Sequence, residues 1–166
     1  MSQGSILILI MAQNKNLKNR SRKDYPFMLE YRTRWSDNDM YDHMNNSIYN
    51  FLFDSVINSY LIDHCALHPP TSAQHPLMAQ THCNYFSPIS YPKVAELCLR
   101  VSKLGRSSVT YEIALFEKGV EQVKAVGEYV QVFVDRSTQR PNANGMNSQL
   151  RDGLEKLHVD TNSSKL

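Results

Sequence analysis

The sequence predicts an α+β fold in which one long helix lies on an antiparallel sheet of about five strands. A helical hydrophobic period occurs over residues 47–65, and two-residue alternation recurs in stretches before and after it. The later stretches follow one another through short polar turns. A single helix followed by a meander of strands favours one layer of helix packed on one layer of sheet.

The first two elements are a strand and the long helix. Residues 27–35 alternate between apolar and mostly charged side chains, which is typical of a half-buried strand. Residues 47–65 place apolar side chains three and four positions apart, so they predict a helix with one apolar stripe. The stripe is expected to contain Ile48, Phe51, Leu52, Ser55, Val56, Ser59, Tyr60 and Ile62. Its two small serines would let the helix lie close against a flat sheet.

Four further strands and a short helix are predicted after the long helix. The strands cover residues 77–86, 94–104, 109–115 and 123–134. A final amphipathic helix is expected from about Asn147 to Leu157. A small sheet around one helix leaves uncovered edges, so we expect pairing with a second copy, as a homodimer or homotetramer.

Length and charge place this fold within one domain. A chain of 166 residues can bury a core without disulfides or metal. We expect a flexible extension at 1–24, the main domain at 25–145, and a C-terminal helix and tail at 146–163. The net charge of +2 comes with no basic stripe that would indicate binding to nucleic acid.

Cysteines, histidines and apolar runs exclude several other classes of protein. The three cysteines are far apart and form no C-x-x-C pair, which predicts reduced thiols and neither a disulfide framework nor a zinc site. The histidines show no metal-ligand spacing, and nothing in the sequence calls for a cofactor. The apolar run at residues 6–11 is too short to span a membrane.

The last three residues carry a targeting signal. Ser164-Lys165-Leu166 matches the tripeptide that the peroxisomal import receptor reads at a C-terminus. The basic N-terminal region, free of acids before Asp24, is a weaker sign of a transit peptide. We therefore expect a peroxisomal protein, with the mitochondrion or the cytosol as the alternative.

The loop at residues 35–46 concentrates the chemistry of the chain. It holds three carboxylates, an imidazole and several amide groups between the first strand and the long helix. Such groups on a loop often form a functional site. The same residue types also form turns and helix caps, so composition alone leaves both interpretations open.

This loop resembles that of the hotdog-fold acyl thioesterases. The similarity rests on residues 34–39 and 43–46 and on the helix after them, and more weakly on residues 103–108 and 134–141. It is closest to the 4-hydroxybenzoyl-CoA thioesterase-like family and extends to plant acyl-carrier-protein thioesterases. The resemblance implies a sheet wrapped around a central helix and hydrolysis of acyl-CoA to a carboxylic acid and coenzyme A.

The resemblance also implies a role for each matching residue. Asp39 matches the catalytic carboxylate, which activates water or attacks the thioester itself. Asn46 stands where a backbone N–H at the helix start polarises the thioester carbonyl. His43 matches an assisting histidine. The candidates for contact with substrate and coenzyme A are Arg106, Ser107, Ser108, Tyr41 and Asn45, with Arg136 and Arg140 as alternatives for the phosphates.

Two departures and two rival functions accompany this interpretation. Tyr41 replaces an asparagine of the plant branch, and Asp42 replaces a glycine of many relatives, which bears on the loop shape. A hotdog enoyl-CoA hydratase usually has its Asp and His five residues apart, whereas Asp39 and His43 are four apart. A non-catalytic acyl-CoA-binding protein would keep the fold, and an assay of coenzyme A release separates it from an enzyme.

Overall fold

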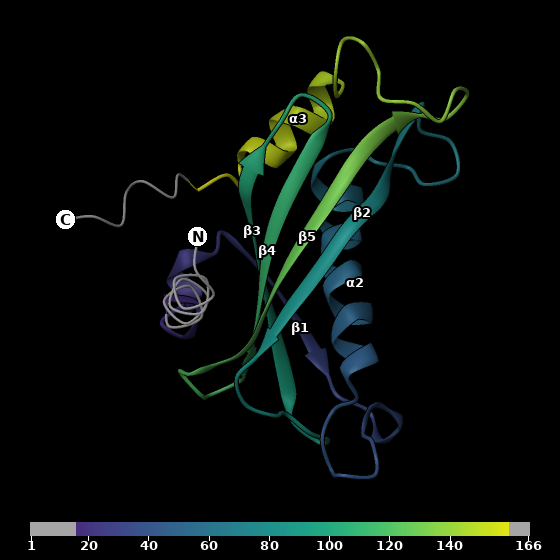
Figure 1. Ribbon diagram of the computed structural model, residues 1–166. Coiled ribbons are helices and arrows are strands. Elements are labelled where there is room, and N and C mark those ends of the chain that lie inside the picture. The colour runs from purple at the N-terminus through teal and green to yellow at the C-terminus, as the bar shows by residue number, and fades with distance from the viewer. Residues whose placement is uncertain (1–15, 160–166) are drawn as a thin grey trace, which may run out of the picture.

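The computed structural model describes residues 16–159 as one curved sheet with a long helix on its concave face (Figure 1). The elements, where η denotes a 3-10 turn, are η1 (Arg22–Asp24), β1 (Phe27–Arg32), η2 (Trp35–Asp37), α2 (Asn46–His64), β2 (Gln74–Tyr85), β3 (Val94–Leu104), β4 (Ser108–Glu117), β5 (Val123–Asp135) and α3 (Ser148–Glu155). The five strands pair antiparallel in the order β1-β3-β4-β5-β2. The predicted α+β hotdog arrangement is confirmed.

The first strand is shorter than its alternation predicts. β1 ends at Arg32, and the chain turns through η2 instead of continuing to Trp35. The carboxylate of Asp37 accepts the backbone N–H of Arg34 at 2.7 Å, which stabilises the turn. The side chain of Asp37 thus offers the N–H of Arg34 an acceptor outside the strand ladder, and Trp35–Asp37 form a 3-10 turn instead of extended strand.

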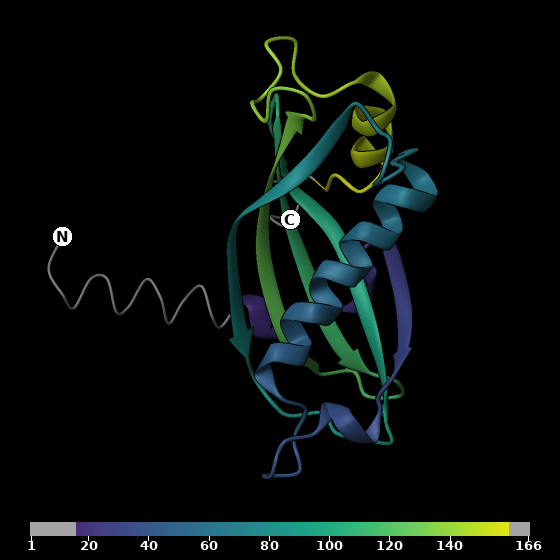
Figure 2. The same ribbon diagram turned by 90° about the vertical axis from the view of Figure 1, so that its right-hand side faces the viewer.

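The helix α2 crosses the sheet diagonally (Figure 2). Near its start, the ring of Tyr49 packs on Tyr85 at the end of β2, with centroids 5.1 Å apart. Near its end, Tyr60 packs on Phe27 at the start of β1, with centroids 5.0 Å apart. The first turns of α2 therefore lie away from the end of β1, and η2 occupies the space below.

The buried face of α2 differs from the predicted stripe. It consists of Tyr49, Leu52, Phe53, Val56, Ile57, Tyr60 and Leu61. Phe51 and Ile62 were expected on the buried face, but they are 75% and 43% exposed. The helix carries apolar residues on more than one side, so spacing alone could not identify the side that meets the sheet.

Close approach of helix and sheet depends on a glycine in the sheet. A Cβ on Gly127 of β5 would lie 2.6 Å from a ring carbon of Phe53, so only glycine leaves room for this ring. The two serines of the predicted stripe, Ser55 and Ser59, are only partly buried. The expectation that they provide the close contact was therefore wrong.

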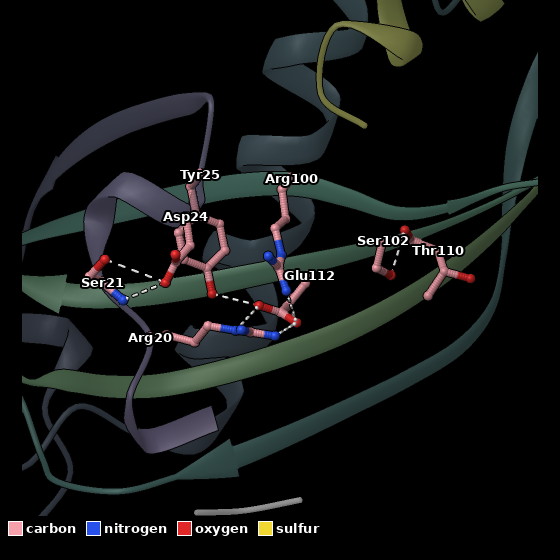
Figure 3. A network of polar contacts seen from close by, with 8 residues as sticks. All are labelled: Arg20, Ser21, Asp24, Tyr25, Arg100, Ser102, Thr110 and Glu112. Carbon is pink, nitrogen blue, oxygen red and sulfur yellow. Dashed lines mark hydrogen bonds and ion pairs between the residues drawn. The ribbon is translucent and has the colours of Figure 1, made fainter. Parts of the chain in front are cut away.

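Residues 16–24 pack on the sheet face opposite α2 (Figure 1). Glu112 of β4 accepts hydrogen bonds from Arg20 at 2.8 Å, from the Tyr25 hydroxyl at 2.7 Å and from Arg100 at 2.9 Å (Figure 3). A flexible extension was expected at residues 1–24. Residues 16–24 instead pack on the sheet, because Arg20 and Arg22 pair with carboxylates of β4 and β3. Residues 1–15 lie outside the described part of the chain.

The C-terminal segment closes one edge of the sheet. Asn147 caps α3 by accepting the N–H of Leu150 at 2.9 Å, close to the predicted helix start. Beyond α3, Val101 donates to Leu157 and accepts from Val159, which covers the part of β3 that extends past the start of β1. Within residues 16–159, the outer edge of β2 has no such cover. The described part of the chain also contains no helix long and apolar enough to cross a membrane.

Candidate active site

The loop between η2 and α2 folds back on itself at the end of the molecule away from α3 (Figure 1). Asn38 and Met44 form an antiparallel bridge, and the N–H of Asp39 donates to the carbonyl of His43 at 2.8 Å. The N–H of Asn45 donates to Asp37 at 2.8 Å and closes the base of the loop. One loop therefore holds Asp39, Tyr41 and His43, and Asn45 and Asn46 follow it at the start of α2.

The carboxylate of Asp39 is held through one oxygen. Its Oδ1 accepts the backbone N–H groups of Tyr41 at 2.8 Å and His43 at 3.3 Å. Its Oδ2 has no hydrogen-bond donor within residues 16–159. A carboxylate fixed by one oxygen and free at the other can accept a proton from water or attack an electrophile.

Asp42 has a backbone conformation that favours glycine, the residue that the family resemblance implies at this position. Its φ is 60°, in the left-handed region that glycine adopts freely. Aspartate is one of the few other residues that visit this region. Aspartate at position 42 is therefore compatible with a loop that needs a left-handed residue there.

The first turn of α2 offers an unused backbone donor. Asn45 caps the helix by accepting the N–H of Ser47 at 2.9 Å, as expected of a capping residue. Asn46 is the first helical residue, and its N–H has no partner among the described residues. A free N–H at the positive end of a helix can stabilise a developing oxyanion.

Asp37 braces the loop from below. It is buried, and its carboxylate accepts the Tyr31 hydroxyl at 2.9 Å as well as the Arg34 N–H. Burial and the bond to Asp37 raise the pKa of Tyr31, so this hydroxyl stays a donor. These bonds give Asp37 a structural role in the loop.

A wall of the site comes from the segment between β2 and β3. Met44 donates to the carbonyl of Ile89 at 2.8 Å, and Tyr91 donates to the side chain of Asn38 at 3.1 Å. A cavity of about 290 Å³ is lined by Trp35, Asn38, Asp39, Asp42, Ser90 and Tyr91. No local pattern indicates this contact, because it joins segments about fifty residues apart.

Cysteine chemistry does not fit the described part of the chain. Burial raises the pKa of Cys65 and Cys83 to about 11, and burial raises the pKa of Cys98 to about 12. These thiols stay protonated near neutral pH, so they are poor nucleophiles. Within residues 16–159, no three His, Cys, Asp or Glu side chains are grouped as metal ligands.

The arginines and serines suggested for coenzyme A lie far from Asp39 in the same chain, unlike Tyr41 and Asn45. β3 starts beside Arg32 near the loop and runs for 11 residues, about 36 Å, before Arg106–Ser108. There the carbonyl of Arg106 accepts the N–H of Met146 at 3.0 Å. Arg136 follows β5 at the same distant end and donates to Ser72 at 2.8 Å. Within one chain, Arg106–Ser108 and Arg136 therefore do not lie at the loop of residues 35–46.

The chain matches proteins of related fold and sequence. PA5185 from Pseudomonas aeruginosa strain PAO1 is 40% identical, with a TM-score of 0.80, over 84% of this chain and 96% of that one. A thioesterase from Thermus thermophilus, solved with coenzyme A and Zn, is 21% identical, with a TM-score of 0.67 over 81% and 96% of the two chains.

A third similar structure is SAV2348 from Staphylococcus aureus in complex with CoA. It is 16% identical, with a TM-score of 0.73, over 80% of this chain and 85% of that one. None of the curated proteins compared with the chain matches it. The model of the thioesterase-like superfamily matches residues 33–150, which include the loop at residues 35–46, α2 and every strand after it. The chain belongs to the thioesterase-like superfamily.

Proposed function

We propose that the protein is an acyl-CoA thioesterase that releases a carboxylic acid and coenzyme A. The observation that carries this proposal is a carboxylate on Asp39 with one oxygen free of hydrogen bonds, in the loop that leads to the free N–H of Asn46 at the start of α2. Thioester hydrolysis needs both groups, one to deliver the oxygen nucleophile and one to receive the oxyanion.

In the proposed reaction, Asp39 removes a proton from water as the water oxygen attacks the thioester carbonyl. Alternatively, its carboxylate attacks directly and forms an anhydride that water then cleaves. In both routes the carbonyl oxygen becomes negative and accepts the N–H of Asn46. The intermediate collapses by breaking the carbon–sulfur bond, and the thiolate of coenzyme A takes up a proton. The ring of His43 is exposed at the loop and assists this transfer.

Coenzyme A is the proposed acyl carrier because two proteins of the same fold, SAV2348 and the Thermus thermophilus thioesterase, were solved with it. We also propose a dimer that pairs the β2 strands of two copies. Antiparallel pairing of identical edges sets the far end of one copy beside the near end of the other. Arg106–Ser108 of a second copy would then approach the catalytic loop. A stable monomer in sedimentation at micromolar concentration would contradict this assembly.

Replacement of Asp39 by Asn tests the function directly. The amide oxygen can still accept the N–H groups of Tyr41 and His43, so the loop keeps its shape while the charge is lost. We expect kcat to fall by about 10²–10⁴-fold in assays of free-thiol release over acyl-CoAs of graded length. The matched control is Asp42→Asn, which removes a carboxylate from the same cavity and should keep most of the activity. Near-normal turnover by Asp39→Asn would refute the assignment.

The rival functions give different results in the same assay. A hydratase would consume an enoyl-CoA without releasing a thiol, and a binding protein would change no acyl-CoA at all. Both outcomes would leave Asp39→Asn and the unmodified protein equally unable to release coenzyme A.

We propose the peroxisome as the site of action, on the basis of Ser164-Lys165-Leu166. These residues lie outside the described part of the chain. A fluorescent protein fused to the N-terminus should co-localise with a peroxisomal marker, and deletion of the three residues should abolish this. Import that persists after the deletion, or a mitochondrial pattern, would contradict the proposal.

A further inference from the structure

We propose that the acyl group of the substrate is a medium-length aliphatic chain that lies in a groove between α2 and the end of β1. This inference rests on the function proposed above. The groove has a volume of about 360 Å³, near the lower end of pockets that hold small molecules. Its helix wall is formed by Ile48, Phe51, Leu52 and Ser55. Tyr31 and η2 line the opposite wall.

The groove follows from the diagonal course of α2 (Figure 2). The helix contacts β2 near its first turn and meets β1 only near its last turns, through Tyr60 and Phe27. A wedge is thus left between the first two turns of α2 and the end of β1. Because η2 fills only the lower part of this wedge, apolar side chains of the helix remain accessible above it.

The polar groups that line the groove are mostly satisfied within the protein. The hydroxyl of Ser55 donates to the carbonyl of Phe51 at 2.6 Å. The carboxylate of Asp37 is taken up by Tyr31 and by the backbone of Arg34, whose guanidinium lies 5.6 Å from the Tyr31 ring centroid. A hydrocarbon chain can therefore displace water from Tyr31, Asp37 and Ser55 without leaving these three side chains unpaired.

Phe51 indicates that a hydrophobic occupant covers this wall. Its side chain is 75% exposed, and Ile48 beside it in the groove is partly exposed, whereas Leu52 is buried beneath them. Ile62 is also exposed on α2, at 43%, but it does not line the groove. An aliphatic chain lying against Phe51 would remove this surface from water.

Both walls lead to the proposed reacting groups. The η2 wall contains Asp37, two residues before Asp39, and the helix wall starts at Ile48, two residues after Asn46. Asp39 itself lines the other cavity, so an acyl chain held at these groups would extend past Asp37 and Ile48 to reach the groove. Along the helix, the wall from Ile48 to Ser55 spans about 10 Å, which suits a medium-length chain better than a long one.

Two substitutions in the groove test the proposal with acetyl-, butyryl-, octanoyl- and palmitoyl-CoA. Ser55→Leu fills the groove and should lower kcat/KM for octanoyl-CoA relative to acetyl-CoA by about 10-fold or more. Phe51→Ala removes the covered surface and should also lower the preference for octanoyl- over acetyl-CoA. Ile62→Ala is the matched control, because it removes an exposed apolar side chain of the same helix outside the groove.

An unchanged chain-length profile in folded, active Ser55→Leu and Phe51→Ala variants would overturn the proposal. So would a change in sedimentation without a change in profile, because it would identify this face as a subunit contact. If the unmodified protein hydrolyses none of the substrates, the proposed function fails first. Calorimetric binding of octanoyl-CoA to the unmodified protein but not to Ser55→Leu would still support the groove, and equal binding to both would refute it.

Discussion

The backbone N–H of Asn45 donates to the carbonyl of Asp37 at 2.8 Å and joins the cap of α2 to the end of η2. The two ends of the segment 38–44, which contains Asp39, are therefore held side by side by this hydrogen bond. The bond sets the Asp39 carboxylate in a defined relation to the first turn of α2. Such preorganisation lets fixed groups stabilise a transition state without moving during the reaction.

Substitution of Asn46 by proline should remove the proposed oxyanion donor with little harm to the fold. Proline lacks an N–H but suits the first position of a helix. The preceding Asn45, at φ −59° and ψ 139°, already has a conformation that proline permits. We expect kcat for acyl-CoA hydrolysis to fall by about 10²–10³-fold in Asn46→Pro, with little change in Asn46→Ala. Equal activity of the two variants would rule out this N–H as the donor.

Substitutions of Asp42 should report its left-handed conformation. Glycine adopts a φ of 60° freely, so Asp42→Gly should retain the stability of the unmodified protein. A β-branched residue is strained there, and Asp42→Val should lower the free energy of unfolding by about 1–2 kcal/mol. Urea denaturation of the two variants measures the difference. Equal midpoints would show that the loop does not depend on this conformation.

Loss of Glu112 should strongly destabilise the protein. Its carboxylate accepts from Arg20, Tyr25 and Arg100, and the side chain of Arg100 is only 5% exposed. Glu112→Ala would leave a buried guanidinium without its partner, at a cost of about 3–5 kcal/mol in urea unfolding. Glu121→Ala is the control, because Glu121 is an exposed carboxylate near the same segment and should have little effect. Similar losses in both variants would argue against a special role of the buried network.

The same carboxylate should make stability depend on pH. Burial alone would raise the pKa of Glu112, but the hydrogen bonds and charges of Arg20 and Arg100 lower it below its ordinary value of 4.5. A lowered pKa in the folded state stabilises the protein above the ordinary value, and this stabilisation is lost as pH falls through the folded-state pKa. The advantage over Glu112→Gln should therefore shrink below about pH 4.5 in unfolding measured at several pH values. A constant difference down to pH 3 would contradict this linkage.

Arg22 and Lys23 form a matched pair in the N-terminal segment. Arg22 binds the carboxylate of Glu96 at 2.6 Å and lies 4.6 Å from the ring centroid of Phe116, whereas Lys23 is exposed. We expect Arg22→Ala to lower the free energy of unfolding by about 2–3 kcal/mol, and Lys23→Ala to have little effect. Equal effects would indicate that only the net charge of this segment matters.

The class of fold and most element boundaries followed from the sequence because they depend on near neighbours in the chain. The strand predicted at residues 94–104 has these bounds in the structure, and the predicted start of the last helix differs by one residue. The polar residues Asn45, Asn46 and Ser47 before the apolar period could each cap the helix, and the structure assigns the cap to Asn45. The chemistry at Asp39 came from family resemblance, since three nearby carboxylates cannot be ranked by composition.

The remaining features depended on contacts between distant segments. The shape of the sheet determined which side of α2 is buried. Phe51 is exposed, although it lies three and four positions from other apolar residues, as a core residue would. Basic residues of segment 16–24 looked like a solvated extension because their partners, Glu96 and Glu112, lie more than seventy residues away.

The sequence by itself determined the α+β class and the helix that starts beside the loop at residues 35–46, and its motif singled out Asp39 and Asn46 as the proposed acid and backbone donor. These features are encoded by hydrophobic period, capping residues and a short motif, all of which act over a few residues. The tertiary structure alone decided which side of α2 is open, that residues near Tyr91 wall the site, and that Arg106 lies at the far end of the sheet. These outcomes arise from the diagonal packing of α2 and the pairing of remote strands, which no local pattern contains.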